Sequence, residues 1–330
     1  MRFKLYIILV LSVLCLGSVT YGLTQSRTSA TDEKFVILVK PGMVANDIGD
    51  LLYKQGAIKS IFLFRVASKL EGMESSFQPG EYSFSKNMTV QQIVAMLARG
   101  ETSYQQITIP EGYTVEQIAK LVQEKQLGNA GDFKKVAQRF VPYPYMINNN
   151  SNVIYKAEGY MFPNTYRITK GTTEEQILGM MTTQFDQQFT EKMRTRANEI
   201  GLSIKDVIIL ASLVEKEAQL PSDRPVIAGV FLNRLKLQMP MQSCATIQYI
   251  LGYPKAELTV QDTEIPSPYN TYQHMGLPPG PIANPGIAAI NAVLYPQKTD
   301  FVYFVADKQG AHHFSKTYEE HLIAIEQVSK

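Results

Sequence analysis

The sequence predicts an α+β fold behind an N-terminal transmembrane helix. An uncharged apolar run opens the chain, short strand-like segments then alternate with capped helices, and a loop rich in proline and asparagine precedes a second, larger α+β region. With 330 residues, the chain has room for a membrane segment and one large or two modest domains. Its 45% hydrophobic and 19% charged residues are typical of a folded protein and exclude wholesale disorder.

The first element is an uncharged run over residues 5–23, which follows Arg2 and Lys4. An apolar helix of this length matches the roughly 30 Å of a bilayer's hydrocarbon core. The alternative, a cleavable signal peptide, would have a shorter apolar core and a small-x-small cleavage site, which this stretch lacks. The positive-inside rule places residues 1–4 in the cytoplasm and the rest outside, with the polar residues 24–34 as a tether.

Small strand–turn–helix units are predicted after the tether. A strand over 35–40 ends in a Pro-Gly turn, and apolar residues at helical spacing then predict a helix that Gly56 ends. A strand over 80–84 leads into a helix whose capping box pairs Thr89 with Gln92. Helices that cover a small sheet form a compact α+β module.

The first of these units has a counterpart later in the chain. Gly112 takes the place of Gly42, and the apolar residues after it repeat those of the first helix. Thr114 and Gln117 form a capping box that opens this second copy. The chain therefore repeats one strand–turn–helix pattern.

The larger region begins after a loop over residues 141–152, in which no strand or helix pattern survives. A long amphipathic helix is predicted over 172–201 and a second helix over 204–219. Residues 301–317 predict a β-hairpin with its turn at 308–310, and a final helix closes the chain. This region is also α+β.

Several classes of function are excluded or disfavoured. The net charge of +2 comes from scattered residues, which argues against a nucleic-acid partner. Cys15 and Cys244 lie too far apart in the chain to predict a disulfide, and no zinc-binding spacing occurs. His312 and His313 are neighbours on a predicted strand, so they face opposite sides and do not suit one metal ion. We predict neither a metal nor a cofactor.

A carboxyl at the end of the 204–219 helix is the strongest catalytic candidate. At about 100° per residue, one face of this helix carries Leu210, Leu213, Val214 and Glu217. Desolvation by such neighbours raises the pKa of a carboxyl, which a general acid near neutral pH requires. The alternative is an acid exposed to solvent at the last helical turn, and spacing alone favours that reading. Glu215 points away from this face, which favours a supporting or salt-bridged role.

Three further clusters are candidates for binding or support. The first has aromatic residues that suit either the core or the wall of a carbohydrate cleft, the second lies in a loop with six prolines between residues 266 and 286, and the third begins on an amphipathic helix. In that order, their members are Glu158, Tyr160, Phe162 and Tyr166; Tyr269, Asn270, Thr271 and Tyr272; Asn233 and Arg234, followed by Gln242, Ser243 and Thr246.

At these residues the sequence resembles the YceG-like endolytic murein transglycosylases. The resemblance covers nearly the whole chain and rests on several motifs in order: "EGYMFPNTY", "LASLVEKE", "VFLNRL", "SPYNTY", "GLPPGPIANPG" and "YFVAD" followed by "GAHHF". It implies a LysM-like glycan-binding module over 35–102 and a transglycosylase domain over 103–330. It also implies anchorage in the bacterial cytoplasmic membrane with the catalytic part outside, and work beside peptidoglycan synthases.

The resemblance implies that Glu217, the second glutamate of the E-K-E motif, is catalytic. The implied reaction cleaves MurNAc-β-1,4-GlcNAc bonds within glycan strands, consumes no water and leaves 1,6-anhydroMurNAc ends, so that growing strands are terminated. One carboxyl suffices, first as general acid and then as base. The alternatives are a hydrolase that pairs Glu217 with Glu158 or Asp223, and a cell-wall-binding scaffold without activity.

The chain departs from the family's pattern at two motifs. Asn164 stands where the family usually has an aspartate, and Cys244 and Ala245 replace an Asp-Pro pair. These departures weaken any claim that the acidic positions are needed for chemistry, and they leave the details of the subsites open.

Overall fold

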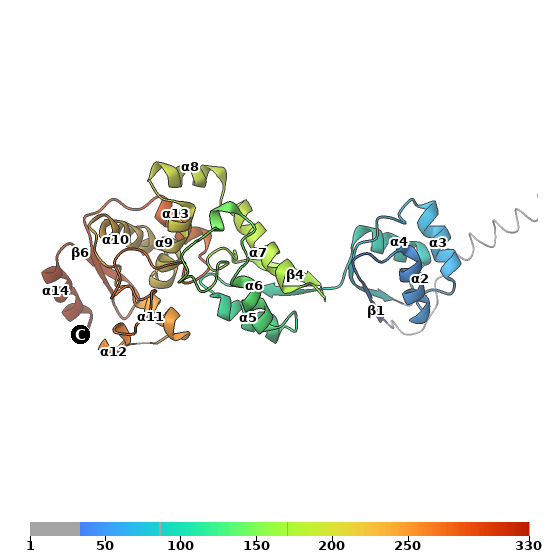
Figure 1. Ribbon diagram of the computed structural model, residues 1–330, viewed down its shortest axis with the longest axis horizontal. Helices are drawn as coiled ribbons and strands as arrows, with labels where there is room; N and C mark the ends of the chain where they lie inside the picture. The colour runs from blue at the N-terminus through green and yellow to red at the C-terminus, as the bar shows by residue number, and fades with distance from the viewer. Residues whose placement is uncertain (1–33, 86, 170, 256, 330) are drawn as a thin grey trace, which may run out of the picture. The chain divides into compact units, whose positions relative to one another are not determined.

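The structure is a computed structural model that describes residues 34–329 apart from residues 86, 170 and 256 (Figure 1). It is an α+β protein, as predicted. The strands are β1 (Lys34–Val39), β2 (Gly80–Ser85), β3 (Tyr104–Thr108), β4 (Thr165–Thr169), β5 (Tyr303–Ala306) and β6 (His312–Ser315). The α-helices are α2 (Ala45–Lys54), α3 (Ile61–Leu70), α4 (Val90–Arg99), α5 (Val115–Glu124), α6 (Ala130–Ala137), α7 (Glu174–Gln188), α8 (Glu191–Glu199), α9 (Ile204–Glu217), α10 (Arg224–Lys236), α11 (Cys244–Leu251), α12 (Val260–Thr263), α13 (Ile287–Leu294) and α14 (Tyr318–Ser329). Two short 3-10 helices are η1 (Pro144–Met146) and η2 (Pro221–Asp223).

The described chain divides into two compact units. The smaller comprises the residues up to Gln106 together with Arg167–Thr172, and the larger comprises Ile107–Tyr166 and the chain from Thr173 onward. The division falls within β3 and β4, which pair with each other.

The smaller unit is a two-stranded sheet covered by helices. Its strands β1 and β2 are antiparallel, with Lys34 opposite Ser85 and Val39 opposite Gly80. The capping box of Thr89 and Gln92 is present at α4, as predicted. Side chains from the two strands and from α2, α3 and α4 form one buried core, whose largest members are Ile48, Leu52, Phe64, Tyr82, Phe84, Ile93 and Leu97.

The predicted repeat of the strand–turn–helix pattern is present in the backbone. Gly42 and Gly112 both adopt positive φ, at +84° and +75°, a conformation that glycine takes without the strain of a side chain. Each precedes a helix, α2 in the first case and α5 in the second. The box of Thr114 and Gln117 caps α5 as expected.

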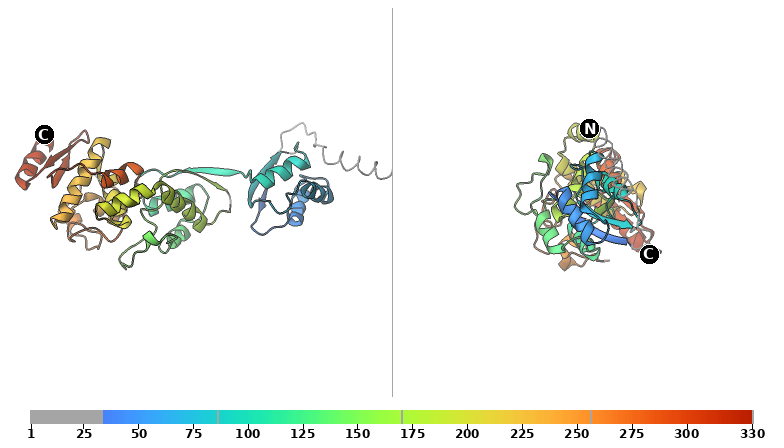
Figure 2. Two further views of the ribbon diagram at one scale, coloured as in Figure 1. Left: turned by 90° about the horizontal axis from the view of Figure 1, so that it is seen from above. Right: turned by 90° about the vertical axis from the view of Figure 1, so that its right-hand side faces the viewer.

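The larger unit is built around α9. This helix contacts α8, α10, α11 and α13, and its apolar side chains form the centre of the unit's core. The predicted hairpin is confirmed: β5 and β6 are antiparallel, with a turn at residues 308–310. The closing helix is confirmed as α14, which lies against that hairpin (Figures 1 and 2).

One long helix was predicted over 172–201, and that prediction is wrong. The segment folds as α7 and α8, separated at Phe189 and Thr190. The Phe189 ring is buried and stacks on Phe185 at 5.6 Å. The break also lets Arg194 return to bond Asp186 at 2.7 Å. Helical periodicity alone does not reveal such a turn, because buried positions recur on both sides of it, at Phe185 in α7 and at Ala197 in α8.

The predicted membrane anchor over 5–23 lies outside the described residues, as does the tether up to residue 33. Within residues 34–329, no helix combines the length and the apolar character needed to cross a bilayer.

Candidate active site

Helix α9 positions the candidate acid. Ser203 caps its N-terminus by accepting a hydrogen bond from the backbone N–H of Asp206 at 3.1 Å. Every residue of Val207–Val214 is buried, because neighbouring helices pack around the helix on several sides. The helix ends at Glu217, slightly before the predicted end at 219. The acid is therefore the last residue of a core helix, not of a surface helix.

The carboxyl of Glu217 is partly buried and hydrogen-bonded through one oxygen. Its Oε1 accepts from Ser243 Oγ at 2.5 Å and from the Ala245 N–H at 3.4 Å. Burial raises the pKa of Glu217, while these two bonds and the charge of His312 lower it, and the net pKa lies above the ordinary glutamate value. A raised pKa keeps a carboxyl protonated at higher pH, as a general acid needs.

Glu215 is buried more deeply than its sequence position suggested. Its side chain is 7% exposed, and its Oε2 accepts from the Gly286 N–H at 3.0 Å. Arg224 Nη2 lies 4.0 Å from the other oxygen. Burial raises the pKa of Glu215, against the bond from Gly286. Glu215 thus ties the end of α9 to the start of α13, which fits a supporting role.

Thr271 holds the loop that carries Ser243 through two hydrogen bonds. Thr271 Oγ1 accepts from the Ser243 N–H at 3.1 Å, and the Thr271 carbonyl accepts from the Gln242 N–H at 3.1 Å. Gln242 has a φ of +47°, so this turn is strained for a residue with a side chain. The loop is therefore built to present Ser243 and Ala245 to Glu217.

Arg234 also holds this loop. Its guanidinium donates to the carbonyls of Val302, Pro240 and Met241 at 2.5, 3.0 and 3.1 Å, and to the Gln242 side chain at 3.2 Å. Its neighbour Asn233 donates to two carbonyls before the hairpin, at 2.8 and 2.9 Å. Arg234 Nε and Nη1 and the Asn233 amide thus bond the protein itself, which favours a supporting role for both residues.

Glu158 is a buried carboxyl that joins four segments. It accepts from the Val115 N–H at 3.1 Å, from Asn284 Nδ2 at 2.9 Å and from Tyr249 OH at 3.3 Å. The side chain is 1% exposed. Burial raises the pKa of Glu158 to about 8, against the three hydrogen bonds, which lower it. It has no surface for a substrate and holds the site's framework.

This shift predicts a pH dependence of stability. Because the folded pKa is raised from 4.5 to about 8, the folded state keeps a proton that the unfolded chain has lost. The free energy of unfolding therefore falls as pH rises from about 4.5 to about 8, by on the order of 4 kcal/mol from this group. Thermal unfolding of the wild type and of Glu158→Gln at pH 5 and pH 8.5 measures the effect. The wild type should lose more stability across that interval than the variant, and equal losses would contradict the assignment.

The aromatic residues of the predicted cleft lie in the core. Tyr160 is 3% exposed and packs edge-on against Phe185 at 5.3 Å. Tyr166 donates to the carbonyl of Phe162, which is itself packed against the core. The burial of Tyr160 favours the core reading over a cleft wall.

The predicted site residues of the proline-rich loop differ in burial. Tyr269 is buried, and Asn270 is buried with its amide donating to the carbonyls of Thr263 and Ile265 at 2.9 and 2.8 Å. Tyr272 is partly exposed, and its hydroxyl lies 3.1 Å from Cys244 Sγ. Thr271 and Tyr272 are thus the members of this cluster that contact the loop carrying Ser243.

Sequence reasoning missed the role of His312. Its ring is almost fully buried, and Nδ1 and the backbone N–H both lie 3.0 Å from Asp223 Oδ2. Burial raises the pKa of Asp223, but the bonds from His312 and Ser222 outweigh it and lower the net pKa. The ring of His312 also acts on Glu217, whose pKa it lowers. The "GAHHF" motif was the signal, but nothing in its spacing pointed to the helix end.

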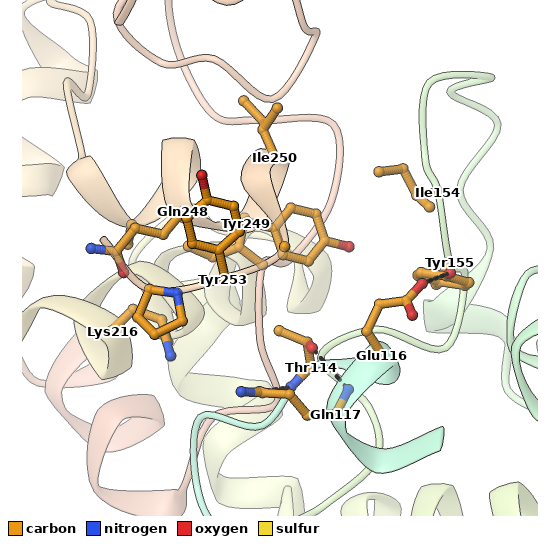
Figure 3. A pocket seen from close by; sticks show the side chains of 14 residues that line it. Thr114, Glu116, Gln117, Ile154, Tyr155, Lys216, Gln248, Tyr249, Ile250 and Tyr253 are labelled. Atoms are coloured by element: carbon orange, nitrogen blue, oxygen red, sulfur yellow. Dashed lines mark hydrogen bonds between the residues drawn. The ribbon is translucent and has the colours of Figure 1, made fainter. Parts of the chain in front are cut away.

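A cavity of about 390 Å³ lies near the end of α9, lined by Lys216 and not by Glu217 itself (Figure 3). The start of α5 lies on one side of it and α11 on the other, with Lys216 at one end. Ala245, whose N–H bonds Glu217, also lines it. An open cavity beside a protonatable carboxyl is the form of a site for acid–base chemistry on a bound ligand.

An α+β unit that holds a desolvated carboxyl beside such a cavity is typical of enzymes that work by acid–base catalysis. The chain belongs to the YceG-like family, whose sequence model matches residues 37–327. It is 35% identical over 319 residues to the endolytic murein transglycosylase of Bacillus subtilis strain 168, covering 92% of this chain and 88% of that one.

Two further relatives extend the comparison. The chain is 34% identical to the endolytic murein transglycosylase of Streptococcus pneumoniae serotype 2, strain D39, over 88% of its own length and 58% of that protein's. A crystal structure of a yceG-like protein from Listeria monocytogenes is 35% identical and covers 89% of this chain and 100% of that one, with a TM-score of 0.62.

Proposed function

We propose that this chain is a peptidoglycan lytic transglycosylase that cleaves MurNAc-β-1,4-GlcNAc bonds within glycan strands and leaves 1,6-anhydroMurNAc ends. The observation that carries the proposal is the carboxyl of Glu217, desolvated at a helix end and oriented by Ser243 and Ala245. The names of the relatives supply the substrate and the endolytic mode.

The hydrogen bonds suggest different roles for the two oxygens of Glu217. Oε1 accepts both bonds, from Ser243 and Ala245. In the described chain no bond is assigned to Oε2, so this oxygen is left to carry the proton. In the proposed reaction Oε2–H gives its proton to the glycosidic oxygen as the bond to C1 breaks. The resulting carboxylate takes the proton of the muramic C6 hydroxyl, whose oxygen then bonds to C1.

The surroundings of Glu217 favour this lyase over a hydrolase. Hydrolysis uses a second carboxylate to activate water or to form a covalent intermediate. Of the two candidates, Glu158 is fully buried and bonded on both oxygens, and Asp223 is committed to His312. With these acids occupied, the intramolecular C6 hydroxyl is the better-placed nucleophile.

Product mass tests the proposal. Nascent glycan strands digested with the full-length chain should give ends that are one water lighter than reducing sugars. Reducing ends would identify a hydrolase. Binding without any new ends would identify a scaffold.

Ser243 should tune the acid. Ser243→Ala removes the 2.5 Å bond to Glu217 Oε1, which lowers the pKa of Glu217 in the wild type. We expect kcat to fall about 10-fold, because the carboxyl loses its orientation. The alkaline limb of the pH–rate profile should move to higher pH, because the acid then holds its proton more tightly. Ser243→Thr restores the hydroxyl and should restore both values, and a profile unchanged in Ser243→Ala would contradict this role.

We further propose that the smaller unit, as a LysM-like module, holds the glycan strand. A cavity of about 900 Å³ lies between residues 42–46 and the stretch from Arg65 to Phe77. Its lining mixes charged side chains with Phe77, which suits a sugar polymer. We also propose single-pass anchorage in the bacterial cytoplasmic membrane, with the catalytic unit outside and peptidoglycan synthases as partners.

A further inference from the structure

The cavity beside Glu217 has an electrostatic character of its own. In its described lining, the charged residue without a salt bridge is Lys216, an exposed residue whose Nζ donates to the Gly112 carbonyl at 3.5 Å. Its charge also acts on Glu215, whose pKa it lowers. Among the described residues no carboxylate lies within 4 Å of that ammonium. A lysine in this state has donors left for an anion.

The carboxylate that lines the same cavity, Glu116, already has partners. Glu116 accepts from Lys134 Nζ at 3.1 Å. It also accepts from the hydroxyl of Tyr155, as Figure 3 shows. The cavity therefore presents a net positive charge at the Lys216 end, and a bound group that carries a carboxylate would be attracted there.

The remaining walls are largely apolar. Ile154, Ile250 and Pro254 line the cavity, and Tyr249 adds a ring whose hydroxyl is turned to Glu158. These surfaces suit small aliphatic groups. A ligand that combines a methyl-sized side chain with a nearby carboxylate matches both features of the cavity.

We propose that this cavity binds the acidic stem peptide that the muramic residue carries on its lactyl ether, with Lys216 facing a peptide carboxylate. The inference rests on the proposed function and adds that the enzyme recognises the peptide part of murein. The link between the acid and the cavity is Ala245, whose N–H bonds Glu217 and which also lines the cavity wall. An alanine followed by an acidic residue, the chemistry at the start of such peptides, fits the apolar wall and the lysine.

The test compares three substrates: strands with acidic stem peptides, the same strands with the second residue's carboxylate amidated, and strands stripped of peptide by an amidase. Full-length wild type in detergent should cleave the acidic strands with a kcat/KM about 10-fold above that for either other substrate, mainly through a lower KM. Lys216→Ala should reduce this preference to near unity. Lys120→Ala is the matched control, since it removes a charge from an exposed position on α5 that does not line the cavity, and it should keep the preference.

The results distinguish failure of the proposed peptide site from failure of the proposed function. Equal cleavage of the three substrates by wild type, or a preference that survives Lys216→Ala, overturns the peptide site. An equal loss on all substrates in Lys216→Ala also overturns it, because the cavity would then hold the sugar itself. Failure of the wild type to cleave any strand, or full activity in Glu217→Gln, would instead overturn the proposed function.

Discussion

Glu217→Gln should reduce strand cleavage by at least about 10³-fold while the protein stays folded. Glutamine keeps a carbonyl oxygen that can accept from Ser243 and from the Ala245 N–H, so the local structure is preserved. It has no acidic proton to give to the leaving oxygen, and it cannot then act as a base. Mass spectrometry of the released ends gives the rate, and thermal unfolding verifies the fold.

Glu191→Gln provides the matched control for this variant. It makes the same chemical change on a side chain that is 88% exposed, on α8, and it should leave cleavage at the wild-type rate. If Glu217→Gln still released anhydro ends at a comparable rate, the acid would have to be sought elsewhere.

Gly159→Ala should destabilise the larger unit by about 3 kcal/mol and lower its Tm by about 10 °C. Gly159 has a φ of +86°, and a methyl group there would lie 2.6 Å from Pro281 and 2.7 Å from Ile208. The glycine is the point where the loop after Glu158 and the proline-rich loop both approach α9. Scanning calorimetry of the full-length chain measures the loss.

Gly201→Ala separates the two causes of this loss. Gly201 has a similar φ of +73° in the same unit, but a methyl group there meets nothing within 4 Å. Only the backbone strain remains, and we expect a cost of about 1 kcal/mol. Equal losses in the two variants would show that the close approach at Gly159 contributes nothing.

Local signals in the sequence were enough for most of the secondary structure. Capping residues such as Thr89 and Thr114 predicted helix starts that the structure confirms, because a cap is a contact between residues three apart. Helices α3 and α13 were not predicted. Both are short and strongly apolar, and their type is decided by packing against other helices, which a single sequence does not display.

The candidate site, too, could be predicted only in part from the sequence. Helical phase singled out Glu217, but it did not show that the whole of Val207–Val214 is buried or that Ser243 reaches the acid. Arg234 and Asn270 were grouped with the site by residue type, and their donors turn out to bond the backbone. Polar residues in a rigid loop look alike in sequence whether they bind a ligand or the chain itself.

The acid's surroundings come from distant parts of the chain, and this has a consequence during synthesis. Glu217 needs Ser243 and Ala245, Glu215 needs Gly286, and α9 packs on α13, which ends at Leu294. Contacts of such long range form late, after the segments between them have been ordered. A nascent chain therefore cannot assemble the acid's surroundings until it has been made almost to its C-terminus, and under the proposed function incomplete chains would not cleave glycan.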